Sequence, residues 1–258
     1  MILSELAKYG INPILPDDPY IYKYTSFESA LKIIENNSLK FSLPQEFNDP
    51  FEMTNALIDT KYTKSDLREW LDSFPDFSNS KKKQLFQDYN KKPAEVIKAF
   101  NISFNKFKNN TGICCFSKSY KKTLMWSHYS DNHSGICLGF YFSSLSSNEE
   151  LLLLTVNYID KVISVNYFRE KLVSLFYWIF TKSKIWEYEE EVRAVHTNGS
   201  GLLKFEKECL KEVYFGLKVS EENKVKFISK LKELGYKVEK ISSMNINSAT
   251  FDLKEKHI

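Results

Sequence analysis

Residues 21–43, IYKYTSFESALKIIENNSLKFSL, contain in succession a strand pattern, a helix pattern and a second strand pattern. Ile21–Tyr24 is rich in β-favouring side chains and predicts the first strand. Ser26 is suited to N-cap the helix that follows. Leu39–Leu43 predicts the second strand, and Pro44 ends it. The apolar face of the helix consists of Ala30, Leu31, Ile33 and Ile34.

The rest of the chain mixes strand and helix patterns without a regular βαβ alternation, which favours the α+β class. Strands are predicted at 111–116, 134–142, 151–158, 186–196, 212–217 and 237–241, and helices at 171–184 and 221–234. Residues 53–110 are rich in Lys, Asp, Asn and Phe and predict a helical insertion. We expect one α+β domain over residues 1–258, with a mixed, largely antiparallel central sheet flanked by helices.

The composition excludes several classes of protein. A formal charge of +3 on 258 residues predicts no dedicated nucleic-acid or membrane surface. The four cysteines include an adjacent pair and form no CxxC motif, so we expect reduced, mostly buried thiols. The N-terminus has no signal-peptide pattern and the apolar runs are too short to span a bilayer, which predicts a cytoplasmic location.

The first polar motif is Phe47-Asn48-Asp49-Pro50-Phe51, directly after the second predicted strand. Asn and Asp before a proline form turns in which their side chains hydrogen-bond nearby backbone amides. The simplest interpretation is a rigid turn between two phenylalanine anchors. The functional alternative is a loop that presents Asn48 and Asp49 at the edge of a cleft.

The second motif, residues 124–135, contains Trp126, His128 and Tyr129 just before a buried strand. His128 could act as a general acid or base because the pKa of histidine lies near neutrality. The alternative is a short helix in which Trp126 and Tyr129 pack and His128 bonds to backbone. We expect no metal, because no second ligand cluster has a spacing that matches His128, Asp131 and His133.

The third motif lies on the strand predicted at 186–196. Alternate residues of a strand share a face, so Glu187, Glu189, Glu191 and Arg193 are expected in line. Such a row is tolerated on a solvated strand. Alternatively, Glu189 and Glu191 stabilise a developing cation or bind ribose hydroxyls above a cleft.

The fourth motif is Tyr22-Lys23-Tyr24 on the first strand, where Lys23 could face a phosphate or simply be solvated. The chain contains no P-loop, GxGxxG, GxSxG or HExxH pattern. This excludes ordinary nucleotide kinases, Rossmann dehydrogenases, α/β-hydrolases and zincins.

Several segments together resemble a bacterial domain family of unknown function, the one numbered twenty-nine seventy-one. They are residues 22–24, 39–42, 47–52, 115–117, 125–129, 135–140, 184, 186, 188–193 and 215–217. The order of parts is also similar, more distantly, to the ADP-ribosyltransferase fold, with a polar first strand and a late Glu-x-Glu strand.

The second resemblance implies an enzyme that uses NAD as substrate, without a metal. Glu191 or Glu189 would be the catalytic glutamate, with His128 nearby, placing negative charge where positive charge develops. Tyr22 or Lys23 would contact the adenosine side, and Phe47–Asp49 would border the nicotinamide. Independently of this resemblance, we expect Trp126, Tyr129 and Arg193 of the second and third motifs to contribute to substrate binding.

A different class of function stays open. The Lys81-Lys82-Lys83 run of the insertion could bind nucleic acid in a toxin or antiphage defence module. His128, Tyr129 and Arg193 could instead cleave RNA. We expect a nucleotide as ligand and allow a nucleic-acid or protein acceptor; the sequence predicts no oligomeric state.

Overall fold

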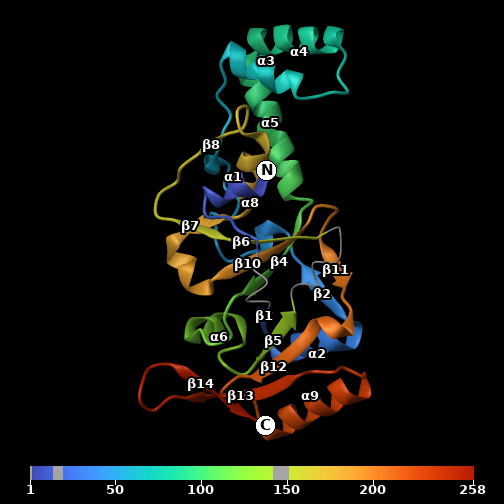
Figure 1. The fold of residues 1–258 in the computed structure, drawn as a ribbon, viewed down its shortest axis with the longest axis vertical. Helices are drawn as coiled ribbons and strands as arrows, with labels where there is room; N and C mark the ends of the chain where they lie inside the picture. Colours follow the sequence, from blue (N-terminus) through green and yellow to red (C-terminus); the bar gives the residue numbers. More distant parts are fainter. Residues whose placement is uncertain (1, 14–19, 142–150) are drawn as a thin grey trace. The chain divides into compact units, whose positions relative to one another are not determined.

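The computed structural model describes residues 2–13, 20–141 and 151–258 (Figure 1). Its contacts divide the chain into two compact units. The first unit comprises residues 1–12, 44–110 and 157–184, and the second comprises residues 13–43, 111–156 and 185–258. The prediction of a single domain stays a prediction. The α+β class is confirmed, because helices and a large sheet share the chain without βαβ alternation.

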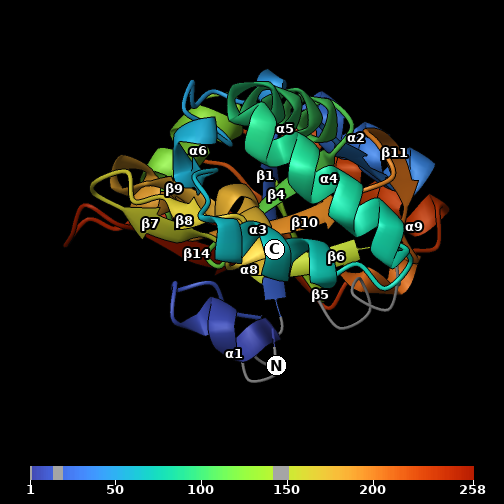
Figure 2. The same cartoon turned by 90° about the horizontal axis from the view of Figure 1, so that it is seen from above.

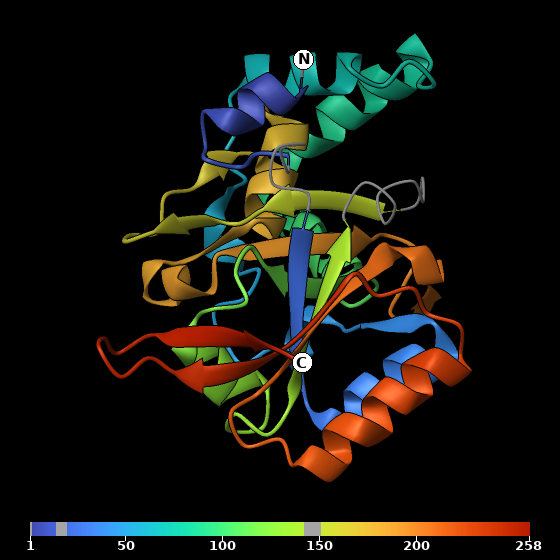
Figure 3. The ribbon, with the colours of Figure 1, turned by 60° about the horizontal axis from the view of Figure 1, so that its bottom comes forward.

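The second unit is built on an eight-stranded sheet with the order β14-β13-β12-β5-β1-β4-β10-β6 (Figure 3). β12 and β13 are parallel, and the other neighbouring strands pair antiparallel, as predicted. The strands are β1 Tyr20–Thr25, β4 Gly112–Ser117, β5 Ile136–Tyr141, β6 Leu151–Thr155, β10 Glu191–His196, β12 Leu210–Phe215, β13 Lys240–Ile246 and β14 Leu253–His257.

Strand alternation gives this sheet two different faces. Ile21 belongs to an aliphatic and phenylalanine core with α2 (Phe27–Asn36) and α9 (Glu221–Glu233). These two helices lie side by side, with the rings of Phe27 and Phe227 6.0 Å apart (Figure 3). Tyr22 and Tyr24 belong to a tyrosine-rich core with α6 (Thr123–Tyr129) on the other face.

The strand–helix–strand prediction for residues 21–43 is confirmed. Ser26 caps α2 by accepting from the Ser29 amide at 3.2 Å, and Asn37 ends the helix in the left-handed conformation. β2 (Ser38–Phe41) follows and pairs with β11 (Gly201–Lys204). A bridge between Ser42 and Ile113 joins the end of β2 to β4.

The first unit is mainly helical (Figure 2). Its helices pack around aromatic side chains. The rings of Trp70 and Phe168 lie 5.4 Å apart, and those of Phe104 and Trp178 lie 5.6 Å apart. The helices predicted within 53–110 therefore share their core with residues 157–184. The elements of the first unit, where η marks a 3-10 helix, are α1 Ile2–Ala7, η1 Pro44–Glu46, η2 Asn55–Leu57, β3 Ile58–Asp59, α3 Lys64–Asp72, α4 Asn79–Lys91, α5 Pro93–Lys108, β7 Asn157–Ile159, β8 Val165–Asn166, α8 Lys171–Ile179 and β9 Thr181–Ser183.

Several predicted elements have different bounds in the structure. The strands expected over 212–217 and 237–241 are β12 and β13, which span Leu210–Phe215 and Lys240–Ile246. The strand expected over 151–158 is interrupted at Val156 and continues as β7, which pairs with β9. The helix expected over 171–184 ends at Ile179, because the following residues form β9 instead. Pro16, Asp17, Asp18 and Pro19 predict a turn from the sequence, but residues 14–19 lie outside the described residues. In the described part of the chain, no helix is long and apolar enough to cross a membrane.

Gly216 offers a test of the packing between the α6–β5 loop and the end of β12. A Cβ at this position would meet the backbone oxygen and carbon of His133 inside van der Waals distance. We expect Gly216→Ala to lower the free energy of unfolding by about 1–3 kcal/mol, the usual effect of overpacking. Urea denaturation measures it, with Ser229→Ala on the exposed side of α9 as control. Equal midpoints for both variants would contradict the close approach.

Candidate functional site

A buried ion pair lies at the start of β10. Arg193 Nε donates to Glu191 Oε1 at 2.9 Å, and Arg193 Nη2 donates to Glu191 Oε2 at 3.3 Å. The side chain of Arg193 is 0% exposed and that of Glu191 is 3% exposed. Removing two charges from water costs several kcal/mol per ion, so such a pair needs good geometry to persist. Here the forked guanidinium meets both carboxylate oxygens.

The predicted strand over 186–196 is wrong in its first half. Lys184–Glu189 forms a 3-10 helix, and Glu190 adopts a positive φ of 44° before β10 begins at Glu191. Glu187 and Glu189 therefore do not share a strand face with Glu191. The Glu190 carboxylate pairs with Lys122 at the bend, which gives this turn a tertiary anchor. The interpretation as a solvated strand face is also wrong, since every residue of β10 is buried.

Glu189 is nevertheless buried, with 3% exposure, and it connects to α6. Tyr129 Oη donates to Glu189 Oε1 at 2.6 Å, a short charge-assisted bond. The residues that precede Tyr129 and Glu189 are also in contact: His128 Nδ1 lies 3.0 Å from Tyr188 Oη. His128 therefore contacts a side chain, where the alternative interpretation expected a bond to backbone. The His128 side chain is exposed.

Lys23 crosses the junction between the two central strands. β1 and β4 are in register at Tyr22 and Ser117, and Lys23 Nζ reaches from β1 to the Cys115 carbonyl oxygen at 2.9 Å. Burial lowers the pKa of this ammonium, but Cys114, Cys115 and Glu191 outweigh that effect and raise the pKa. Burial also raises the pKa of the Cys115 thiol.

A cavity of about 430 Å³ opens beside Lys23 in the second unit. Lys23 and Tyr129 both line it, so they connect the cavity with the buried carboxylates of Glu191 and Glu189. None of the described residues that line it carries a carboxylate. The polar lining consists of Lys23, Thr25, Ser26, Ser29, Lys32, Asn36, Ser38, Lys40, Ser42 and Tyr129.

The other predicted residues of the second unit lie outside this lining. Tyr22 Oη donates to Glu212 at 3.1 Å, in the tyrosine-rich core on the opposite face of the sheet from Ile21. Trp126 is fully buried, and its Nε1 donates to the Tyr120 carbonyl at 2.8 Å. The Tyr22 ring packs against Tyr120 and Tyr214, and the Trp126 ring packs edge-on against Tyr24 of β1. We assign Tyr22 and Trp126 a structural role.

The Phe47–Asp49 turn belongs to the first unit. Asp49 Oδ1 accepts from the Phe51 amide at 2.9 Å, so the predicted rigid turn is present. Asn48 is exposed. Phe51 is 69% exposed and is not the anchor that we expected, while Phe47 is half-buried. The role of this turn at a binding site stays a prediction.

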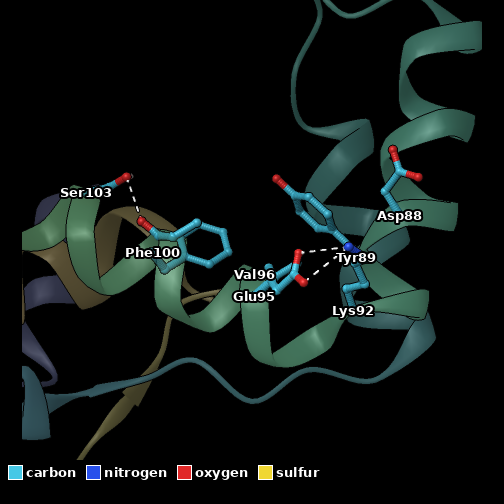
Figure 4. Close-up of a pocket in the computed structure, with 8 residues that line it drawn as sticks. Asp88, Tyr89, Lys92, Glu95, Val96, Phe100 and Ser103 are labelled. Carbon is cyan, nitrogen blue, oxygen red and sulfur yellow. Dashed lines mark hydrogen bonds and ion pairs between the residues drawn. The ribbon is translucent and has the colours of Figure 1, made fainter.

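The first unit contains a second hollow of about 300 Å³ between α4 and α5 (Figure 4). Tyr89 and Phe100 line it, and Lys92 and Glu95 form an ion pair of 3.2 Å at its rim. Both charged partners are largely exposed, so this hollow lacks the buried polar groups seen near Lys23. Across the described residues, no group of three His, Cys, Asp or Glu side chains is arranged to hold a metal ion.

Lys32 and Lys40 are cavity residues that the sequence reasoning missed. Ser29, Lys32 and Asn36 are spaced for one face of α2. Ser38, Lys40 and Ser42 alternate along β2 and its extension. Both patterns are visible in the sequence and could have been found by following polar as well as apolar periodicity.

Residues 125–194 match the model of a family described as a protein of unknown function (DUF2971). The match begins in α6 and ends in β10, so it contains His128, Tyr129, Glu189, Glu191 and Arg193. No curated protein matches the chain. The buried network of Tyr129, Glu189, Glu191 and Arg193 therefore lies within the part of the chain that the family model covers.

The buried ion pair gives a test by substitution. We expect Arg193→Met to lower the free energy of unfolding by roughly 3–5 kcal/mol, because Glu191 loses its buried partner. Glu191→Gln together with Arg193→Met should cost less than the sum of the two single substitutions. Chemical denaturation of the four proteins measures the coupling.

The matched control is Lys230→Ala, which breaks the exposed Lys230–Glu233 pair and should leave the unfolding midpoint unchanged. If Arg193→Met behaves like this surface control, the burial of the pair contributes nothing to stability.

Proposed function

We propose that the second unit is an NAD-using enzyme of the ADP-ribosyl-transferring type. One observation carries the proposal: buried Glu189 is hydrogen-bonded to Tyr129, which lines a cationic cavity beside Lys23. Clusters of buried, mutually coupled ionisable groups beside a cavity are typical of functional sites. The likeness of the Glu-x-Glu segment to ADP-ribosyltransferases supports this choice of reaction.

The geometry distinguishes the two candidate glutamates. Glu191 is held by the guanidinium of Arg193 through both carboxylate oxygens, so we assign it a positioning role. Glu189 reaches the cavity through Tyr129. We therefore place the reacting ribose near Tyr129 Oη, with Glu189 behind it as the source of negative charge.

The proposed reaction breaks the bond between the nicotinamide nitrogen and ribose C1′. The electron pair leaves with nicotinamide, and positive charge develops on the ribose ring. Glu189, whose own carboxylate is buried, stabilises this charge electrostatically. Water or another nucleophile then bonds to C1′ and loses its proton. His128, 3.0 Å from Tyr188 Oη, is the proposed acceptor of that proton.

Release of nicotinamide from NAD tests the proposal. We expect Glu189→Gln to lower the rate by roughly 100- to 1,000-fold, the loss typical of removing one charge-stabilising group. Tyr129→Phe should also lower the rate of nicotinamide release, because it removes the hydroxyl that links Glu189 to the cavity.

Glu187→Gln is the matched control, because Glu187 lies on the same 3-10 helix and is exposed. Its rate should equal that of the unchanged protein. Normal nicotinamide release by Glu189→Gln, with the fold intact by circular dichroism, would overturn the assignment.

A second candidate function rests on α4. This helix has no buried residue, and both Lys81 and Lys83 are exposed on it. Two exposed lysines on one helix are suited to contact phosphates of a nucleic acid. This activity would belong to the first unit and does not require the cavity of the second.

Single-stranded RNA binding at several salt concentrations tests this candidate. Lys81→Ala with Lys83→Ala should weaken binding and reduce the slope of log affinity against log salt by roughly 1.4, the value for two lost phosphate contacts. Lys98→Ala with Lys106→Ala, both exposed on α5, is the charge-matched control. Equal slopes for the two double variants would exclude α4 as the binding surface.

A further inference from the structure

The cavity beside Lys23 carries three lysines on three different elements. Lys23 lies on β1, Lys32 on α2 and Lys40 on β2, and all three line the same space. No carboxylate is among the described residues that line the cavity. An anion placed among the three lysine side chains would be attracted to each of them.

The neutral lining fits the same ligand class. Hydroxyl groups of serine and threonine donate to oxyanions, and several of them line the cavity together with the Asn36 amide. An ammonium carries three N–H donors, and Lys23 directs its donors to the Cys115 carbonyl oxygen and the Cys114 side chain as well as lining the cavity. The cavity therefore offers many donors around a positive centre, which is the chemistry that phosphate oxygens require.

Most of the side chains that line the cavity come from regular secondary structure. On α2 the spacing of Ser29, Lys32 and Asn36 puts them on one side of the helix. On β2 alternation puts Ser38 and Lys40 on one side of the strand. The main-chain bonds of both elements hold these side chains in place, and Ser42 continues the row where the bridge to Ile113 fixes the chain.

We infer that this cavity is a phosphate-binding site for a nucleoside diphosphate moiety, with Lys32 and Lys40 as its principal cationic contacts and Lys23 at its inner end. Its volume of about 430 Å³ lies in the range of small-molecule sites. The inference deepens the proposed function by naming the part of the ligand that the cavity holds. It does not depend on bond cleavage, because phosphate binding requires only the lysines and the hydroxyls.

Isothermal titration with inorganic pyrophosphate, ADP and adenosine tests the inference on the full chain at low salt. We expect pyrophosphate and ADP to bind, and adenosine to bind at least tenfold more weakly than ADP. Affinity for ADP should fall steeply as salt is raised. Binding of adenosine as tight as that of ADP, or no binding of either phosphate compound, would overturn the inference.

Lys32→Ala with Lys40→Ala should weaken ADP binding at least tenfold and leave the weak adenosine binding unchanged. Both lysines are exposed, so the fold is expected to persist. Lys226→Ala with Lys232→Ala, two exposed lysines of α9, removes the same charge elsewhere in the second unit and should have no effect. Equal ADP affinity of the two double variants would also overturn the inference.

Glu189→Gln separates this inference from the proposed function. The variant should keep ADP binding and lose nicotinamide release if both proposals hold. The Lys32→Ala/Lys40→Ala variant could lose ADP binding and still release nicotinamide at the normal rate. That result would confirm the phosphate site and count against a role for the cavity in the reaction.

Discussion

Within the described residues, β1 and β4 are in register at one pair, Tyr22 and Ser117, in the middle of an eight-stranded sheet. The other side of β4 is paired along its whole length with β10, which puts Glu191 opposite Ser117. The ammonium of Lys23, bonded to the Cys115 carbonyl, joins the two strands beyond the register pair. Because β1 and β4 pair over so short a stretch, the space beside this pairing can hold polar side chains. The candidate site lies in that space.

The polar groups near this junction are costly to keep. Glu189, Glu191 and Arg193 are each at most 3% exposed, and buried ions are retained only when partners compensate for lost hydration. Arg193 supplies a forked partner to Glu191, and Tyr129 supplies a hydroxyl to Glu189. A purely structural domain could replace such a network with apolar side chains of similar volume, often at no loss of stability. Its presence beside a cavity is what favours a function here.

The two proposals for the second unit assign different parts of the ligand to two adjacent regions. The cavity between β1, α2 and β2 supplies positive charge and hydroxyl donors, which suit phosphate groups. The network behind Tyr129 supplies negative charge, which suits a developing ribosyl cation. Lys23 and Tyr129 are the side chains that belong to both regions, so a ligand with phosphates at one end and a reactive ribose at the other would use both.

By itself, the sequence determined the elements whose signals are local: the Ser26 cap, the apolar face of α2 and the alternation of β1 all act within a few residues. It also identified Glu189, Glu191 and Arg193 as unusual. Only the tertiary structure decided that Lys184–Glu189 is a 3-10 helix, because burial of Glu189 against Tyr129 and the left-handed Glu190 depend on residues some sixty positions away. The same holds for Lys32 and Lys40, whose shared cavity exists because β2 folds back beside β4, a pairing that no short-range pattern specifies.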